Sequence, residues 1–331
     1  MCNFKLLKKA RNNKKLSLEQ LCERTGISVS ELEQLEAGSL KMNKEQAIKL
    51  GHELEVIAEE LLNKSDDDEG DYEMKLEKTI VITTATNKGG EGKSSITQNL
   101  GYALSQMGYK VLLVDTDGQM NLSQAYGIRD GGDKNFYDAF ENKDSLMNHV
   151  TETEYGVDLI VGHPKMKKIE GLMASISLSE KRFKAIVNPV REANVYDFVI
   201  VDTSPNLSKF NESILNASDK VLIPLEAAIF GVEGIGNIVE YVNEASEEYP
   251  VEILGVVMNK VDARIGLTKD VRGLIENAFG DKKLNSEIRQ DTNIKYAQVE
   301  GMPLAEYDKS SRAVEDFKML AKEVIQNVIK K

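Results

Sequence analysis

Cysteine is scarce in this 331-residue sequence, and the two that occur, Cys2 and Cys22, both lie near the amino terminus. Two thiols exclude a framework of several disulfides and a cysteine-rich metal site, and they suit a reducing cytosol. No apolar run reaches the roughly 18 residues that a membrane-spanning helix needs. The first residues, Met1 to Lys5, also lack the hydrophobic stretch of a signal peptide. We therefore expect a cytoplasmic protein without a membrane span.

The sequence also has no excess of positive charge. The 54 acidic residues outnumber the 42 lysines and arginines, so the formal net charge is −12. A protein with this charge is not attracted as a whole to nucleic acid or to an anionic membrane, and any such binding needs a local basic patch. The length suggests about two domains. Residues 1–64 are close to neutral, which leaves the negative charge to the rest of the chain.

Residues 1–64 read as a series of short helices. The sequence Ser17-Leu18-Glu19-Gln20 is a capping box that predicts the start of one helix, and Gly26 ends it. A second capping box, Ser28-Val29-Ser30-Glu31, opens the next helix, which runs to about Glu36. Further helical patterns occur at 44–50 and 56–62. Two short helices joined by a glycine-containing turn indicate a helix-turn-helix.

The segment resembles the Cro/CI-type (XRE) helix-turn-helix domain. The resemblance rests on 16–21, on 25–28 and on the sequence Leu35-Glu36-Ala37-Gly38. It implies DNA binding by the second helix of the motif, where Ser28, Ser30 and Gln34 are the candidates for reading base edges. That helix contains three glutamates and no basic residue, so lysines elsewhere in the segment would have to contact phosphates. The alternative is a helical docking domain that does not bind DNA. Residues 65–77, which begin with a run of aspartates, are predicted to be an exposed acidic linker.

The stretch 79–95 carries the clearest signal for chemistry. Its β-branched residues predict a buried parallel strand, a glycine-rich turn follows, and apolar residues at helical spacing come after Lys93-Ser94. A strand, a glycine loop, Gly-Lys-Ser and a helix form the phosphate-binding arrangement of P-loop nucleotidases. The glycines let backbone N–H groups approach phosphate, Lys93 neutralises phosphate charge and the Ser94 hydroxyl can ligate Mg²⁺. The alternative is a glycine turn that binds nothing.

This loop departs from the common P-loop, because Asn87 replaces its first glycine and a second lysine, Lys88, precedes Gly89. The variant resembles the deviant P-loop of the ParA/MinD group of ATPases. That resemblance implies a homodimer with ATP between the subunits, in which Lys88 reaches the nucleotide of the partner subunit. The residues then expected to contact the nucleotide are Lys88, Gly89, Gly90, Glu91, Gly92, Lys93, Ser94 and Ser95.

Three aspartates end later buried strands. Asp115 is the last residue of the predicted strand 110–115, and Asp117 follows two residues later. Asp202 follows the apolar run 198–201. Ligands bind at the carboxyl ends of strands in open α/β sheets, so these carboxylates are site candidates. The first pair resembles the family motif Asp-x-Asp-Pro-Gln-x-Asn, with Gly118 in place of proline. The resemblance implies that Asp117 positions the attacking water, that Asp115 supports the Mg²⁺ site and that Asp202 holds Mg²⁺ through a water. The alternative is that Asp115 and Asp117 only cap the next helix.

Further buried strands are predicted at 156–161, 220–225 and 253–258, with helical stretches between them. This alternation predicts an α/β fold with a doubly wound, mostly parallel sheet over residues 78–331. The family resemblance makes Asn259, after the last of these strands, a candidate for contacting adenine. A solvated asparagine at the end of a strand is the alternative.

Residues 286–303 resemble the matching segment of plasmid-type ParA proteins, which share its Ala-Gln and Gly-x-Pro. The resemblance implies DNA binding without sequence preference by basic residues of this region, and Arg289, Lys295 and Arg312 are the candidates. The alternative is scattered surface charge. The last apolar stripe, 314–329, predicts a core-packed helix, and a MinD-like membrane helix is its alternative.

Taken together, the resemblance implies an ATPase that uses ATP and Mg²⁺ in the partition of a plasmid or another mobile element. A DNA-bound, ParB-like partner protein would stimulate hydrolysis, and the protein would associate with the nucleoid. One alternative is a transcription or replication regulator that nucleotide switches. Another is a MinD-like membrane-cycling ATPase. Electron transfer of the nitrogenase-iron-protein type is excluded because no cysteine follows Cys22.

Overall fold

The computed structural model describes residues 4–54, 56, 61–62, 76–86, 88–205, 208–226, 251–262 and 267–329. The chain divides into two compact units, and each is described by itself. One comprises Met1–Lys75 with Lys322–Lys331, and the other comprises Leu76–Ala321. The predicted linker 65–77 and the predicted helix 56–62 lie almost entirely outside the described residues. The predicted domain boundaries therefore stay predictions.

The helical unit begins with four helices, α1 (Phe4–Asn13), α2 (Leu18–Thr25), α3 (Val29–Ala37) and α4 (Lys44–Leu54). Both predicted capping boxes are confirmed: the hydroxyl groups of Ser17 and Ser28 each accept a backbone N–H from the third helical residue, which returns a side-chain contact. Gly26 and Gly38 end α2 and α3 in the left-handed conformation that glycine favours. Local sequence signals thus set the helix-turn-helix geometry.

Leucines from all four helices form the core of this unit. Leu7, Leu21, Leu32, Leu35 and Leu50 are fully buried. Burying a leucine side chain contributes on the order of 2 kcal/mol, so these five residues are the main source of stability for so small a unit.

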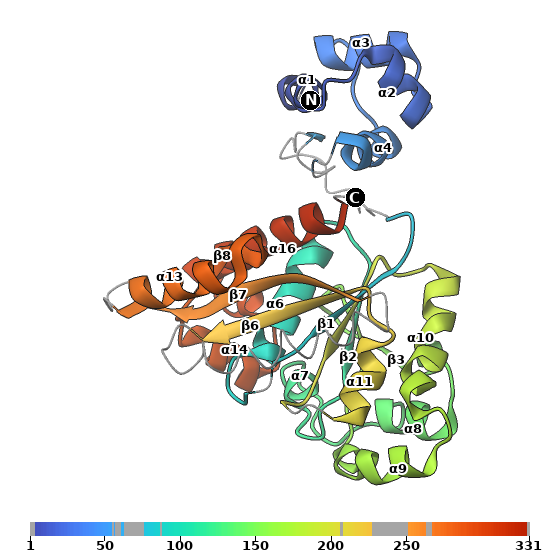
Figure 1. Cartoon of the computed structure of the whole chain (residues 1–331), viewed down its shortest axis with the longest axis vertical. Helices are drawn as coiled ribbons and strands as arrows, with labels where there is room; N and C mark the ends of the chain where they lie inside the picture. Colours follow the sequence, from blue (N-terminus) through green and yellow to red (C-terminus); the bar gives the residue numbers. More distant parts are fainter. Residues whose placement is uncertain are drawn as a thin grey trace. The chain divides into compact units, whose positions relative to one another are not determined.

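The larger unit is built on an eight-stranded sheet with the order β3-β4-β2-β5-β1-β6-β7-β8 (Figure 1). All neighbouring strands are parallel except β3 and β4, so the predicted mostly parallel sheet is confirmed. The strands are β1 (Ile80–Thr84), β2 (Val111–Asp115), β3 (Val150–Glu152), β4 (Asp158–Ile160), β5 (Phe198–Asp202), β6 (Lys220–Glu226), β7 (Glu252–Val261) and β8 (Lys283–Arg289).

Two of these strands were not predicted from the sequence. The strand β3 is three residues long and is the antiparallel edge next to β4. The strand β8 has buried residues only at alternate positions, because it is the opposite edge of the sheet. Edge strands carry weaker apolar signals than strands buried on both faces, which explains why the apolar pattern did not reveal them.

Helices cover both faces of the sheet. Figure 1 shows α6 and α16 to one side of the central strands and α10 and α11 to the other. The second layer packs its phenylalanines, Phe136, Phe140, Phe183 and Phe210, against β2, β4 and β5. The helices of this unit are α6 (Lys93–Gln106), α7 (Asn121–Gln124), α8 (Phe136–Asn142), α9 (Ile169–Ser175), α10 (Arg182–Ala193), α11 (Lys209–Leu215), α13 (Leu267–Phe279), α14 (Asn293–Glu300), α15 (Leu304–Tyr307) and α16 (Arg312–Ile329).

The final helix is packed as predicted. Its residues Phe317, Leu320 and Ala321 are at most 3% exposed. Among the residues that the structure describes, none of the helices combines the length and apolarity that crossing a bilayer requires.

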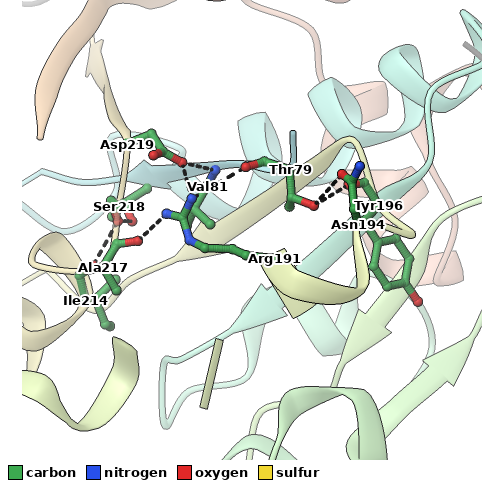
Figure 2. Close-up of polar contacts among 10 residues, drawn as sticks. Thr79, Val81, Arg191, Asn194, Tyr196, Ile214, Ala217, Ser218 and Asp219 are labelled. Atoms are coloured by element: carbon green, nitrogen blue, oxygen red, sulfur yellow. Dashed lines mark hydrogen bonds and ion pairs between the residues drawn. The ribbon is translucent and has the colours of Figure 1, made fainter. Parts of the chain in front are cut away.

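A polar cluster fixes the amino end of β1 (Figure 2). The Arg191 guanidinium, from the end of α10, donates to the Asp219 carboxylate at 2.8 Å and to the Ala217 carbonyl at 2.6 Å. The same Asp219 carboxylate accepts the N–H of Val81 at 2.7 Å. The Thr79 hydroxyl donates to the Tyr196 carbonyl at 2.7 Å. These contacts anchor β1 at the end opposite its glycine loop, and thereby help to fix where that loop begins.

Candidate functional site

The three central strands end side by side at the carboxyl edge of the sheet. In the register of the sheet, Asp202 of β5 lies beside Thr84 of β1 and beside Asp115 of β2. The predicted strand-end aspartates are therefore brought together next to the glycine loop that follows β1. This edge is where parallel α/β sheets bind ligands.

The glycine loop leads directly into α6, which begins at Lys93. Gly90 and Gly92 have φ angles of 89° and 90°, which side-chain-bearing residues rarely adopt. At Gly92 a Cβ atom would lie 2.1 Å from Nδ2 of Asn259, so only glycine fits this position. Among the described residues, no acceptor takes the N–H of Glu91 or of Gly92. Two N–H groups without protein partners beside a helix start form a suitable cradle for an anion.

Lys93 is the cation of this cradle. Its side chain is 8% exposed, and burial lowers the pKa of its ammonium group. The carboxylates of Asp202 and Asp117 oppose that shift and favour the charged form. Lys93 is thus a largely buried cation among carboxylates, at the position that the sequence predicted.

Asp202 stands out among the carboxylates of the site. It is fully buried, and neither of its carboxylate oxygens has a hydrogen-bond partner among the described residues. Burial raises the pKa of this carboxyl group well above its ordinary value, and the Asp115 carboxylate adds to the shift. The Ser94 hydroxyl and the Lys93 ammonium act in the opposite direction. A buried carboxylate without hydrogen bonds is costly, so Asp202 is suited to bind a cation or an ordered water.

Asp115 is equally buried but its hydrogen bonds are complete. One oxygen accepts the N–H and the hydroxyl of Ser123 at 2.8 and 2.6 Å, and the other accepts the N–H of Asp117 at 3.1 Å. Burial raises the pKa of the Asp115 carboxyl to about 6, although these bonds favour the charged form. A Cβ atom at Gly162 would lie 2.8 Å from the Asp115 carboxyl carbon, which explains the glycine there. Asp115 thus holds the loop before α7 in place. Because it also accepts the N–H of Ser123 in the first turn of α7, it contributes to capping that helix, as the alternative interpretation proposed.

Asp117 belongs to the same loop and is largely buried. One of its carboxylate oxygens accepts the N–H of Gln119 at 2.9 Å, and the residue is 9% exposed. The unexpected Gly118 has a structural reason, because a Cβ atom there would approach the backbone nitrogen of Lys167 to 3.1 Å. The close approach of the segment Pro164–Lys168 therefore favours glycine at this point.

The remaining loop residues contact the protein itself. The Lys88 ammonium lies 3.6 Å from the carboxylate of Glu91, whose side chain is 2% exposed. Ser94 is half-buried at the start of α6, whereas the Ser95 hydroxyl accepts the Gln298 amide at 2.9 Å. The predicted adenine contact, Asn259, is 3% exposed and donates to the Glu91 carbonyl at 2.7 Å, so it is not a solvated strand end.

Three further residues near the loop were not predicted from the sequence. Lys260 donates to the Gly90 carbonyl at 2.6 Å and to the Glu226 carboxylate at 3.1 Å. The N–H of Glu226 donates to the Glu91 carboxylate. Gln298 reaches Ser95 from α14. The shared Ala-Gln pattern contains Gln298 but did not indicate this contact, and the sequence carried no signal for Lys260, which is 170 residues from its acceptor.

Comparison with known proteins agrees with this geometry. A family model described as an AAA domain matches residues 78–253, and a helix-turn-helix model matches residues 7–61. A ParA family protein of Chlamydia pneumoniae is 32% identical over 258 residues, which cover 75% of this chain and 97% of that protein. The chain belongs to the ParA family. The expected resemblance is confirmed for both parts of the chain.

Solved structures share the fold of the ParA-family unit. A plasmid partition protein of Borrelia burgdorferi bound to AMPPNP is 20% identical with a TM-score of 0.62, and 74% of this chain matches 98% of that one. The septum site-determining protein MinD of Pyrococcus horikoshii, complexed with Mg-ADP, is 24% identical with a TM-score of 0.58, over 74% and 96% of the two chains. At these identities the likeness shows a shared fold.

One of the residues predicted to read DNA bases, Ser28, instead caps the amino end of α3 in the helix-turn-helix unit. The Ser28 hydroxyl is bonded to Glu31 at 2.6 Å, whereas Ser30 and Gln34 are exposed on α3. Three basic side chains of α1, Lys5, Lys8 and Lys9, line a cavity of about 440 Å³ together with Phe4, Asn12, Asn13 and Glu36. Positive charge and predicted base-reading residues therefore lie on different helices of the unit.

The three basic residues predicted near the carboxyl end have different environments. The Arg289 guanidinium is paired with the Asp316 carboxylate at 2.6 Å and also donates to the Arg312 carbonyl at 2.9 Å. The side chains of Lys295 and Arg312 are exposed. Arg289 therefore links β8 to α16, and the other two are the accessible cations of the predicted set.

Proposed function

We propose that this chain is an ATPase of the partition type, and that ATP with Mg²⁺ binds at the carboxyl edge of its sheet. The observation that carries the proposal is the buried, unpartnered carboxylate of Asp202 beside Lys93 and the glycine loop. Such a carboxylate needs a cation or an ordered water. The fold shared with AMPPNP-bound and Mg-ADP-bound proteins supports the same ligand.

The residues present fit a magnesium nucleotide. The described residues contain no group of three or more His, Cys, Asp or Glu side chains that could hold a metal alone. Mg²⁺ in phosphate sites is bound by few protein groups together with phosphate oxygens and waters, so Ser94 and Asp202 suffice. Asp115 supports Asp202 from the neighbouring strand. When bound, Mg²⁺ would neutralise the charge that develops on the phosphate oxygens.

Hydrolysis needs a positioned water, and Asp117 is our candidate for this role. The water oxygen forms the new bond to the γ-phosphorus while the bond to the bridging oxygen of ADP breaks, and the proton of the water leaves through the carboxylate to solvent. Lys93 and the N–H groups of Glu91 and Gly92 would stabilise the phosphate charge during this step. The products are ADP and inorganic phosphate.

The second lysine gives the proposed cycle its dependence on a dimer. Lys88 is half-exposed and paired with Glu91 of its own chain. The pair is long, at 3.6 Å, and its lysine is half-exposed, so Lys88 can exchange Glu91 for the phosphates of a partner subunit's nucleotide. ATP would then hold two copies of the chain together, and hydrolysis would separate them.

The proposed dimer binds DNA without sequence preference and carries a plasmid or another mobile element during partition. Lys295 and Arg312 are the accessible candidates for phosphate contacts, with Arg289 adding charge near them. A DNA-bound, ParB-like partner stimulates hydrolysis and so releases the dimer. This cycle takes place in the cytoplasm, on the nucleoid.

A second candidate function rests on the helix-turn-helix unit. Ser30 and Gln34 are exposed on α3 and are able to read base edges, which favours binding to an operator. In a partition ATPase this unit regulates the operon of the protein. In the alternative, operator binding is the main activity and the nucleotide only switches it.

Gel-shift titrations of the full chain test both functions. A random-sequence duplex is titrated at fixed salt without nucleotide, with ADP, and with ATP plus Mg²⁺, alongside the double variant Ser30→Ala/Gln34→Ala. We expect binding only with ATP and Mg²⁺, unchanged in the double variant. DNA binding that does not depend on nucleotide and is lost in the double variant would refute the proposed partition function and show that the chain is a DNA-binding regulator.

A further inference from the structure

The outer side of the glycine loop is held by two consecutive residues at the end of β7. Asn259 donates its side-chain amide to the Glu91 carbonyl at 2.7 Å, and Lys260 donates its ammonium to the Gly90 carbonyl at 2.6 Å. Both acceptors are backbone carbonyls of the loop. These contacts join β7 to a segment that follows β1, although β6 lies between the two strands in the sheet.

The geometry of the peptide bond gives these contacts a consequence. In a planar trans peptide, the carbonyl of one residue and the N–H of the next point in opposite directions. Holding the Gly90 carbonyl outward therefore turns the N–H of Glu91 inward, and holding the Glu91 carbonyl outward does the same for the N–H of Gly92. Neither of these two N–H groups has an acceptor among the described residues.

Lys260 is itself held in place for this contact. Its backbone has a φ angle of 53°, which is uncommon for a residue with a side chain. Its ammonium also contacts the Glu226 carboxylate at 3.1 Å, and the N–H of Glu226 donates to the buried Glu91 carboxylate. The ends of β6 and β7 thus surround the loop with one connected set of hydrogen bonds.

We propose that Asn259 and Lys260 are positioning residues, which orient the N–H groups of the glycine loop toward the phosphates of the nucleotide. This gives Asn259 a role different from adenine contact and gives Lys260 a role that the sequence did not predict. The proposal rests on the proposed function, because it assumes that the loop binds nucleotide phosphates. It makes a distinct claim: the two side chains affect affinity through the phosphates and not through the base.

The test compares ligands that share a base and differ in phosphate number. Affinities of the full-length protein for AMP, ADP and ATP with Mg²⁺ are measured by calorimetry for wild type, Lys260→Met and Asn259→Ala. We expect each substitution to weaken ADP and ATP binding about tenfold, which is the lower end of what a hydrogen bond from a charged group such as Lys260 contributes and the upper end for a neutral donor such as Asn259. AMP binding should change less than twofold.

The chain offers a matched control at the opposite edge of the same two strands. Lys220 of β6 pairs with Glu252 of β7 at 2.5 Å, as Lys260 of β7 pairs with Glu226 of β6. Lys220→Met removes the same charge and the same kind of pair, far from the loop, and should leave all three affinities unchanged. Lys260→Arg keeps a donor and should recover part of the lost ADP affinity. Thermal melting of each variant verifies that it is folded.

The possible results separate the two proposals. A wild-type protein that binds neither ADP nor ATP would refute the proposed function. Wild-type binding of both, with Lys260→Met indistinguishable from Lys220→Met, would refute only the positioning role of Lys260. An equal loss for AMP, ADP and ATP in Asn259→Ala would overturn its positioning role and return it to contacting the base.

Discussion

The carboxylate of Asp202, which has no hydrogen-bond partner among the described residues, leads to a prediction: replacing it should stabilise the protein without ligand but weaken ligand binding. In the protein without ligand, burial raises the pKa of this group above its ordinary value of 3.8. Above that pH the unfolded chain releases the proton more readily than the folded protein does, so the group lowers stability as the pH rises toward its folded pKa. Asp202→Asn keeps the shape and removes the charge. The variant should therefore be more stable than wild type at pH 8, and the difference should shrink as the pH falls and disappear near pH 3.8, the ordinary pKa of the group.

The magnitude follows from the contacts of the site. Leaving a buried polar group without a partner costs about 1–3 kcal/mol. The substitution also removes one counter-charge of Lys93, but Asp117 and Glu91 remain to oppose its desolvation. We therefore take the lower half of that range, about 1–2 kcal/mol. For a unit of roughly this size, 1 kcal/mol corresponds to about 2–4 °C in Tm, so the expected gain at pH 8 is about 2–8 °C.

The assay is thermal unfolding of wild type and Asp202→Asn between pH 3.5 and 8.5, with and without Mg-ADP. Ligand should raise the Tm of wild type more than that of the variant, so that the order of stability reverses when ligand is present. Asp219→Asn is the control, because the Asp219 carboxylate has partners in Arg191 and Val81 and its loss should lower Tm at every pH. An Asp202→Asn variant that melts at or below wild type at pH 8 without ligand would refute the reasoning.

The remaining predictions concern the glycine loop and the proposed cycle. Lys88→Ala should abolish ATP-dependent dimerisation measured by light scattering and leave nucleotide affinity within about twofold, since the Lys88 ammonium is paired with Glu91 within its own chain. Unchanged dimerisation would disprove its role across the subunits. Asp117→Ala should trap the ATP-bound dimer and lower phosphate release at least about a hundredfold, and undiminished release would remove Asp117 from the mechanism. Gly92→Ala places a Cβ atom 2.1 Å from Nδ2 of Asn259 and should weaken ADP binding more than about tenfold. In the control Gly171→Ala, the Cβ atom meets nothing within 4 Å, and ADP binding should be unchanged. Equal ADP affinities of these two variants would contradict the requirement for glycine at position 92.

Local signals made much of the fold predictable. The capping boxes of Ser17 and Ser28, the glycine that ends α2 and the alternation of buried strands with helices depend on residues close together in the chain. The edge strands β3 and β8 were missed because edges require less continuous apolar sequence. The helix predicted at 56–62 and the linker lie almost entirely outside the described residues, so they remain predictions.

The sequence was less informative about what each site residue does. It placed Asp115 and Asp202 at one edge of the sheet, but it did not distinguish them. The structure separates their roles, because Ser123 completes the hydrogen bonds of Asp115 whereas Asp202 has no partner among the described residues. That difference depends on how the loop after β2 folds back, which no local pattern records.

The sequence by itself determined the alternation of the central strands with helices and the glycine loop with its lysines, because each of these depends on the spacing of neighbouring residues. The tertiary structure alone decided which residues hold that loop in place. Lys260 and Asn259 reach it from 170 and 168 residues away, and Glu226 reaches it from 135. Contacts over such distances arise only when the sheet aligns the ends of β1, β6 and β7, so the orientation of the loop is a property of the folded sheet.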